Sequence, residues 1–264
     1  MQDTTISPAS NSDQVRNIAA GKGAVRSDNL SARIEPFDSY WQAPDDIDAG
    51  YQKFYQYYLH NYLSHLPEDK KSNVLVVSCG PGYLVSLLKE KGYENVLGID
   101  SDSDKIAYAE KRGLNCRTER AFEHLLDIEE EYDVIIAEQE LNHLTHSETI
   151  EFLNLCNKAL RKDGLVMVYG LNGANPLVGA ENLAHNIDHF YTMTEYSFEQ
   201  LLKYTNFKDV KVRPLKLYVF WKNPLNYVGW VVTAVLELGM RAVCILYGKN
   251  VKIFTKKVAA NARK

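Results

Sequence analysis

The stretch from Asn73 to Asp100 constrains the fold of this chain more than any other. It reads NVLVVSCGPGYLVSLLKEKGYENVLGID. An apolar run at 73–77 leads into a turn of small residues, and a helical pattern follows at 83–91. A second apolar run at 95–99 then ends in an acid. Strand, turn, helix and strand in this order predict a βαβ unit, the building block of a parallel sheet.

The alternation of strand and helix continues downstream. We expect further strands at 114–118, 132–137 and 165–170, and helices at 103–112, 120–127, 147–161 and 195–205. Short apolar strands are typical of a sheet that helices cover on both faces. The segment DVKVRPLKLYVFW at 209–221 predicts two strands around Pro214 at an antiparallel edge. The predicted fold class is therefore α/β, a Rossmann-like, doubly wound, mostly parallel sheet with an antiparallel edge strand.

Additions flank this sheet. The chain has 264 residues, of which 45% are hydrophobic, enough for one sizeable domain. Residues 1–35 lack periodic apolar positions and predict a mobile tail. We place the domain itself at 36–222 and a C-terminal amphipathic helix with a basic tail at 223–264. Tyrosines at helical spacing within 47–62 predict an N-terminal helix, and this stripe either packs on the sheet or walls a substrate pocket.

Composition excludes some classes of function. The net charge of −4 and pI of about 6.0 argue against nucleic acid as the main partner. Four scattered cysteines form no CxxC pair and fit a reducing compartment. The polar, acidic N-terminus does not resemble a signal peptide, so we predict a cytoplasmic protein.

The glycine turn and the following acid point to a ligand. Small residues at Gly80 and Gly82 let backbone approach a bound molecule closely, although a tight strand-to-helix turn needs them too. Asp100 lies twenty residues after Gly80, the spacing at which an acid accepts hydrogen bonds from ribose hydroxyls. The pattern GxGxxG is absent because Val85 occupies the last position, and GxxxxGK[ST] does not occur. The expected ligand therefore carries an adenosine-like ribose.

Three segments together resemble one family. Residues 74–113, YDVIIAEQELNHL at 132–144 and LNLCNKALRKDGLVMVYGLN at 153–172 are similar to motifs of class I methyltransferases that use S-adenosylmethionine. The resemblance covers about residues 70–210. It implies that Gly80 and Gly82 cradle the amino-acid end of the cofactor and that Asp100 holds its ribose.

The resemblance extends to a fuller set of cofactor-binding residues and also shows departures. The implied set is Ser78, Cys79, Gly80, Gly82, Tyr83, Asp100, Ser101, Arg120, Ala121, Glu138, Gln139 and His143. The family usually has an acid at Val76, a glycine at Ser78 and an aspartate at Arg120. Glu138, Gln139 and the N-terminal aromatic residues are candidates to replace the missing carboxylate.

The acceptor side is suggested by the segment 171–207. It resembles a segment of bacterial methyltransferases of surface-polysaccharide (O-antigen or capsule) clusters, with matches at Asn172, Pro176, His189 and Thr194. Asn186 and Asp188 depart from that pattern. His189 is therefore either a base or acceptor ligand, or a loop histidine that braces the turn. His143 is either part of the cofactor wall or the base.

A metal site is a further interpretation of the histidines. His185 and His189 are four residues apart and His143 and His146 three apart, and with Asp188 they could form a nitrogen and oxygen site. No thiol pair supports zinc, and we predict no required metal.

The C-terminal region predicts a helix from Leu225 to Tyr247. Its polar residues Asn226, Thr233, Glu237 and Arg241 form one narrow stripe, and cations accumulate after Glu237. Four interpretations of this helix are open. It packs on its own domain, packs on a second subunit in a homodimer, lies on an anionic membrane surface, or lines a channel for the acceptor. Glu237 and Arg241 argue against a spanning helix.

The leading hypothesis is a methyltransferase that acts on a sugar hydroxyl of a surface polysaccharide or its lipid-linked precursor. The first rival is a methyltransferase for a diffusible small molecule. The second is a non-catalytic nucleoside-binding module, which the departures at Val76 and Ser78 would fit.

Overall fold

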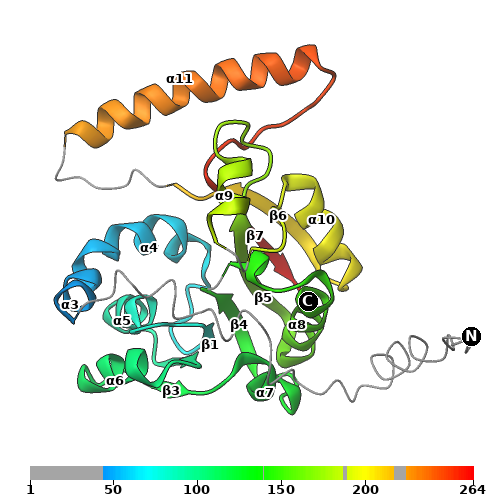
Figure 1. The fold of residues 1–264 in the computed structure, drawn as a ribbon. Coiled ribbons are helices and arrows are strands. Elements are labelled where there is room, and N and C mark those ends of the chain that lie inside the picture. Colours follow the sequence, from blue (N-terminus) through cyan, green and yellow to red (C-terminus); the bar gives the residue numbers. More distant parts are fainter. Residues whose placement is uncertain (1–43, 139, 187–188, 217–223) are drawn as a thin grey trace, which may run out of the picture.

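The computed structural model describes residues 44–138, 140–186, 189–216 and 224–264. The expected tail at 1–35 and Gln139 therefore lie outside the described residues, as does Asp188. The described part contains a seven-stranded sheet in the order β3-β2-β1-β4-β5-β7-β6, with helices on both faces (Figure 1). This confirms the predicted Rossmann-like fold.

Five strands run parallel. They are β1 (Asn73–Val77), β2 (Asn95–Asp100), β3 (Cys116–Thr118), β4 (Tyr132–Ala137) and β5 (Leu160–Leu171). The helices between them are α5 (Tyr83–Glu90), α6 (Ser103–Lys111), α7 (Ala121–Leu126), η3 (Leu141–His143) and α8 (His146–Ala159). Parallel neighbours place all their carboxyl ends at one edge of the sheet, where such folds bind ligands.

Alternate residues of each strand feed two cores. In β1, Leu75 and Val77 join the core under α7, α8 and α10, whereas Val74 and Val76 join the core under α5 and α6. Val76 is fully buried. Burial of both faces explains the continuous apolar runs in the sequence.

The remaining helices begin with α3 (Pro44–Lys53), α4 (Tyr55–Asn61) and η2 (Leu63–His65). Tyr51, Tyr55, Tyr57 and Tyr58 are partly buried against the second core, and Tyr62 is buried within it. The tyrosine stripe therefore packs beside the sheet. The chain after β5 forms α9 (Gly179–His185) and α10 (Glu195–Tyr204). A reciprocal capping box between Thr194 and Ser197 begins α10.

The antiparallel part of the sheet differs from the prediction. β6 (Lys208–Pro214) is the edge strand, and the expected second strand after Pro214 falls largely outside the described residues. Its partner is instead β7 (Lys257–Arg263), which lies between β5 and β6 and pairs antiparallel with both. The expectation that residues 223–264 form a helix followed only by a basic tail is wrong for residues 257–263. Small buried residues, among them Ala259, Ala260 and Ala262, make β7 a central strand.

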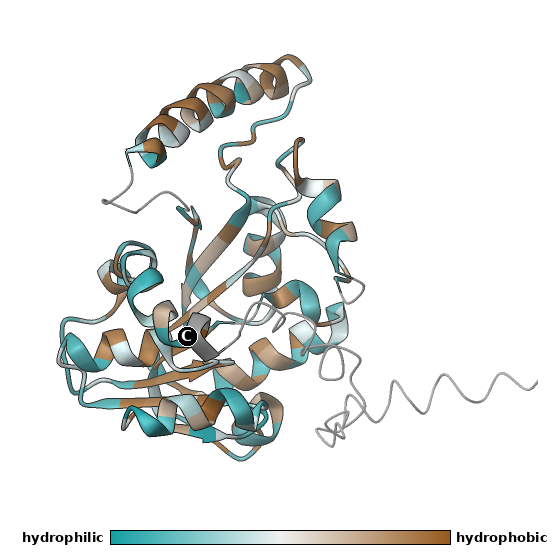
Figure 2. Cartoon of the chain, turned by 60° about the vertical axis from the view of Figure 1, so that its left-hand side comes forward, coloured by the Kyte–Doolittle hydropathy of each residue, from teal (hydrophilic) through white to brown (hydrophobic). Residues whose placement is uncertain are grey.

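The C-terminal helix α11 (Leu225–Leu246) is present and connects β6 to β7. It lies apart from the body of the domain in both views (Figures 1 and 2). None of its residues is buried.

Candidate active site

The turn between β1 and α5 has an unusual backbone. Ser78, Gly80 and Gly82 all have positive φ, at 55°, 54° and 81°. A Cβ at Gly80 would meet nothing within 4 Å, so this backbone faces open space. A Cβ at Gly82 would lie 2.9 Å from Leu114 Cδ1, so this glycine faces the core. The two glycines thus differ: Gly80 leaves room for a ligand, and Gly82 permits packing.

Asp100 ends β2 beside this turn. Its carboxylate accepts hydrogen bonds from the Gly80 amide at 2.8 Å and the Asp102 amide at 2.9 Å. The side chain is buried. Burial raises the pKa of Asp100, although the hydrogen bonds from the two amides act to lower it. Each oxygen of a carboxylate has a second lone pair, so ribose hydroxyls can still donate to it. The acid is therefore fixed in place before any ligand binds.

Two members of the expected set point their side chains elsewhere. Cys79 is buried, and its thiol interacts with that of Cys116. The Tyr83 hydroxyl donates to the Ile47 carbonyl at 3.0 Å, and its ring packs on Phe54. The side chains of Cys79 and Tyr83 therefore belong to the core, and only their backbones lie in the turn.

Two hollows lie at the carboxyl ends of the parallel strands. One is lined by small and apolar residues that include Ser78, Ala121 and Ala137. The other, of about 440 Å³, is lined by Ser101, Thr118, Glu119, Arg120, Glu123 and His124. The small hollow at Ala121 and Ala137 is about 30 Å³, and the wider one begins at Ser101, the residue after Asp100. These residues fit an adenosine-containing cofactor.

Glu138 follows β4 and stands near the place of the missing family acid. Val76 lies in the core, so it contributes nothing polar. Burial raises the pKa of Glu138 to about 7, although the hydroxyls of Tyr58 and Tyr62 and the charge of Lys257 oppose this rise. The N-terminal tyrosines therefore both pack and hold a carboxylate, and the role of Glu138 as a substitute for the family acid stays a prediction.

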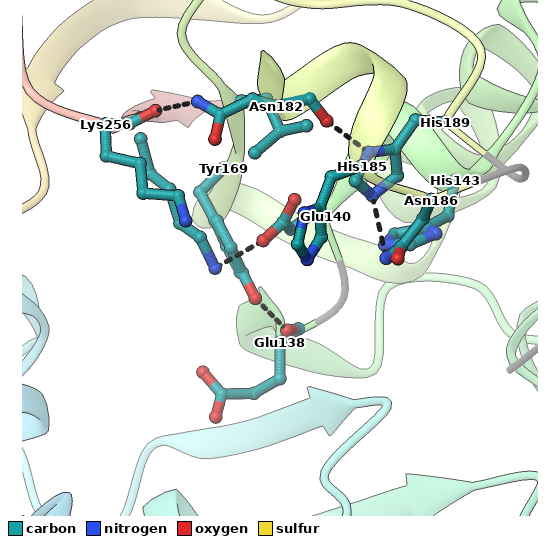
Figure 3. Close-up of a pocket in the computed structure, with 11 residues that line it drawn as sticks. Glu138, Glu140, His143, Tyr169, Asn182, His185, Asn186, His189 and Lys256 are labelled. Atoms are coloured by element: carbon teal, nitrogen blue, oxygen red, sulfur yellow. Dashed lines mark hydrogen bonds and ion pairs between the residues drawn. The ribbon is translucent and has the colours of Figure 1, made fainter. Parts of the chain in front are cut away.

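A polar cavity of about 360 Å³ opens next to Glu138 (Figure 3). It is lined by residues in or next to β4, η3, β5, α9 and β7, namely Glu138, Glu140, His143, Tyr169, Leu171, Asn182, His185, Asn186, His189, Lys256 and Lys257. The Tyr169 hydroxyl donates to the Glu138 carbonyl. The cavity holds acids, cations and amides together, and such a surface can bind a polyhydroxylated molecule.

His143 and His189 meet in this cavity, with ring centroids 4.7 Å apart. His189 Nδ1 lies 2.6 Å from the Asn182 carbonyl oxygen. Because a carbonyl only accepts, Nδ1 must carry a proton, which makes Nε2 of the neutral ring the hydrogen-bond acceptor. Asn186 Nδ2 is 3.3 Å from this Nε2. The geometry thus prepares His189 as a proton acceptor.

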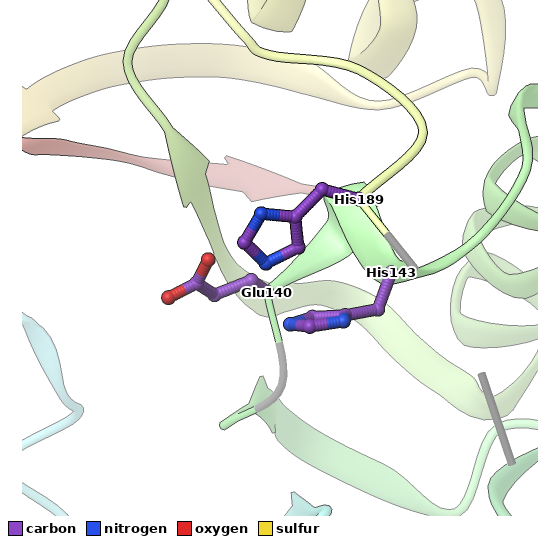
Figure 4. Close-up of side chains that lie close together, drawn as sticks. All are labelled: Glu140, His143 and His189. Atoms are coloured by element: carbon purple, nitrogen blue, oxygen red, sulfur yellow. The ribbon is translucent and has the colours of Figure 1, made fainter. Parts of the chain in front are cut away.

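Glu140 completes a cluster with the two histidines (Figure 4). One ligand atom of each residue lies within 4.8 Å of the others, close enough to hold a metal ion. Lys257 forms an ion pair with Glu140, and its charge lowers the pKa of this carboxyl although burial opposes the change. The positive charge of Lys257 thus already balances the negative charge of Glu140.

The histidines weighed for a metal site separate in the structure. His146 stacks on Tyr191 with centroids 4.3 Å apart, and His185 pairs with Glu181 at 2.9 Å. Of these four histidines, His143 and His189 contact each other, and His185 lines the same cavity.

Sequence reasoning missed Glu140, Tyr169, Asn182, Lys256 and Lys257. Glu140 could have been found as an acid three residues after a strand, at the carboxyl edge. Lys256 and Lys257 could not, because their position depends on β7 inserting between β5 and β6.

The strand order, the glycine turn and the ribose-type acid together define a class I methyltransferase fold. A family model described as "Methyltransferase domain" matches residues 51–212, more than half of the chain. The chain therefore belongs to this methyltransferase family, and its cofactor is S-adenosylmethionine. No curated protein matches the sequence significantly.

Solved structures share this fold at low sequence identity. A SAM-dependent methyltransferase from Archaeoglobus fulgidus has a TM-score of 0.59 and 20% identity, covering 86% of this chain and 98% of that one. Phosphoethanolamine N-methyltransferase 2 from Haemonchus contortus, in complex with S-adenosyl-L-methionine, has a TM-score of 0.60 and 16% identity over 92% of this chain and 61% of that one. The plantazolicin methyltransferase BamL, in complex with a triazolic desmethylPZN analogue and SAH, has a TM-score of 0.51 and 17% identity, covering 96% of this chain and 98% of that one.

Proposed function

We propose that this methyltransferase methylates a hydroxyl of a sugar, in a surface polysaccharide or its lipid-linked precursor, on the cytoplasmic side of a bacterial membrane. The observation that carries the proposal is His189, whose Nδ1 is held by the Asn182 carbonyl at the wall of a polar cavity. A hydroxyl acceptor needs such a base, whereas an amine acceptor that is already neutral does not.

The chain's own residues divide into two groups. Gly80, Asp100 and the hollow at Ala121 would bind the cofactor, and Glu138 would face its positively charged end. The cofactor supplies an electrophilic methyl group when bound. His189 would accept the proton of the acceptor hydroxyl at Nε2, and the adjacent His143 would wall the same space.

A diffusible small-molecule acceptor is the second candidate. Structures with this fold have names that include phosphoethanolamine N-methyltransferase and a plantazolicin methyltransferase, so the fold alone selects no acceptor. The presence of Glu138, a carboxylate in place of that missing at Val76, counts against a non-catalytic module.

The decisive experiment compares His189→Ala with His143→Ala. We expect His189→Ala to lower turnover by ~10²–10⁴-fold, the contribution of a positioned base, while SAH affinity measured by calorimetry changes little. The assay uses candidate glycans and small hydroxyl compounds in parallel, so that it also separates the two acceptor classes.

Melting temperatures of both variants control for loss of fold, because His189 also braces the loop after α9. Dialysis against a chelator controls for metal, and we expect no loss of activity because Lys257 compensates Glu140. Near-normal turnover of His189→Ala on a true acceptor would overturn the base assignment. Activity that disappears on chelation and returns with one divalent ion would assign the cluster to metal instead.

A further inference from the structure

The helix α11 exposes a large apolar surface. Leu246, Leu238 and Val235 are 86%, 70% and 65% exposed, and the helix is mostly brown in Figure 2. Of the described helices, it is the one long and apolar enough to cross a membrane. An apolar surface of this size on a folded domain marks an interaction site.

The helix is nevertheless two-sided. Its less exposed positions, Asn226, Gly229, Thr233, Glu237, Met240 and Cys244, follow one another at spacings of three and four and so form a single line. This line carries three of the helix's polar side chains. The opposite faces are apolar and exposed, which is the pattern of a helix that lies at an interface.

The segment that connects β6 to β7 and contains α11 is attached to the domain at both of its ends. Before α11, the side chain of buried Asn61 binds both the amide and the carbonyl of Lys216 at 2.9 Å. After α11, Asn172 Nδ2 donates to the carbonyls of Ile253 and Thr255, at 3.0 and 2.9 Å. The helix is therefore held at two points of one domain.

This attachment excludes a spanning orientation. A helix of 22 residues is ~33 Å long, about the thickness of the bilayer core. The seven steps from Leu246 back to Ile253 reach at most ~25 Å even when fully extended, too little to recross ~30 Å of hydrocarbon. On the other side, the nine steps from Lys216 to Leu225 reach at most ~32 Å, so a crossing there would need nearly fully extended backbone, whose polar groups would remain unpaired in lipid.

Charge and aromatic residues indicate what covers the apolar faces. Over the described residues 224–256 the charged side chains are Glu237 and four cations, Arg241, Lys249, Lys252 and Lys256. Tyr227 and Trp230 near one end and Tyr247 at the other are all more than half exposed. Aromatic rings near both ends and a cationic flank are typical of a helix at an anionic lipid surface. If α11 were instead buried in an apolar protein interior, its lysines would find no negative charge to pair with.

We propose that α11 lies in the plane of an anionic membrane surface, with its apolar faces in the lipid. β6 and β7 join α11 at the carboxyl edge of the parallel strands, because Leu171 at the end of β5 pairs with Lys257 at the start of β7. The helix therefore holds the active-site edge toward the lipid. This inference rests on the helix and its attachments and does not depend on the acceptor.

The test is binding of the full chain to sedimented vesicles, of phosphatidylcholine alone or with one third phosphatidylglycerol. We expect binding at least ~10-fold tighter to the anionic vesicles, since several cations flank the helix. Val235→Asp with Leu238→Asp should weaken it ~100-fold or more, because two exposed apolar side chains that would enter the lipid become charged. The matched control, Asn226→Asp with Thr233→Asp, adds the same charge on the polar line and should weaken binding much less.

SAH affinity, measured on every variant, reports folding independently of lipid. Release of the bound protein by alkaline carbonate supports the in-plane orientation, and retention would overturn it. Sedimentation velocity without lipid tests the rival occupant. A dimer that the Val235→Asp and Leu238→Asp pair dissociates, together with no vesicle binding, would assign the apolar faces to a second copy of this chain.

Discussion

Asp100 connects the end of β2 to both the glycine turn and the start of α6 through its two carboxylate oxygens. Asp100 thus holds the turn and the start of α6 in place even without a ligand. Its alanine variant is therefore ambiguous by itself, since it would loosen the turn as well as remove the ribose acceptor. An amide at this position keeps the size and some of the hydrogen bonds but removes the charge.

We expect Asp100→Asn to weaken SAH binding by ~1.5–3 kcal/mol, about the value of hydrogen bonds to a charged group. The melting temperature should fall by only a few degrees. Calorimetry with SAH measures the first quantity and thermal unfolding the second. Unchanged affinity in a folded Asp100→Asn protein would remove Asp100 from the cofactor site.

Glu138 gives a prediction for pH. Its pKa rises from 4.5 to about 7 on folding, so the folded state holds a proton that the unfolded state has already lost. This residue's contribution to stability is complete below pH 4.5, falls as the pH rises from about 4.5 to about 7, and is constant above.

Replacing Glu138 by Gln removes this pH-dependent contribution to stability. We therefore expect the melting temperature of Glu138→Gln, relative to the wild type, to rise by several degrees between pH 5 and pH 8. The same variant should bind SAM more weakly at pH 8, because the ionised carboxylate attracts its positive charge. A melting-temperature difference that does not change with pH would contradict the raised pKa.

Among the described strands, β7 is the one that sequence reasoning did not find, and the short helix α9 was not expected either. Strands β1, β2 and β4 could be predicted from their apolar runs, because burial of both faces demands such runs. Residues 257–263 read KVAANAR, whose small side chains and terminal cations are typical of a solvated tail. Only the positions of β5 and β6 make them a strand, and this information is non-local.

The same limit applies to the candidate site. Asp100, Gly80 and both histidines could be predicted because motifs near one another in sequence carry them. Lys257 reaches Glu140 only through the sheet. Cys79 and Tyr83 were placed in the site by their neighbourhood in the turn, but a turn also sends alternate side chains into the core.

Substitutions in β7 distinguish a central strand from a tail. Ala260 is fully buried and pairs with Val168 and Val212. Ala260→Glu should lower the melting temperature by more than ~10 °C, because it buries a charge among apolar side chains. Arg263→Glu, at the exposed end of the strand, serves as control and should change it by only a few degrees. Equal, small effects would contradict the central position of β7.

For the whole molecule, α11 contributes surface and little stability. None of its residues is buried, so the domain should fold without it. We expect replacement of residues 218–251 by a short glycine and serine linker to leave the melting temperature within a few degrees and SAH affinity unchanged. Thermal unfolding and calorimetry measure both. A large loss of stability would show that α11 packs on the domain.

The two asparagine attachments have a consequence for how such a domain diversifies. Closing a loop costs free energy that grows only with the logarithm of its length, about 0.6 kcal/mol for each doubling. Asn61 and Asn172 fix the chain on either side of the segment that contains α11, so the sheet is insulated from whatever lies between them. The segment between β6 and β7, whether it is a helix, a loop or a small domain, can therefore be exchanged while the stability of the domain stays almost constant. Where the enzyme works in the cell can then change separately from the chemistry that it performs.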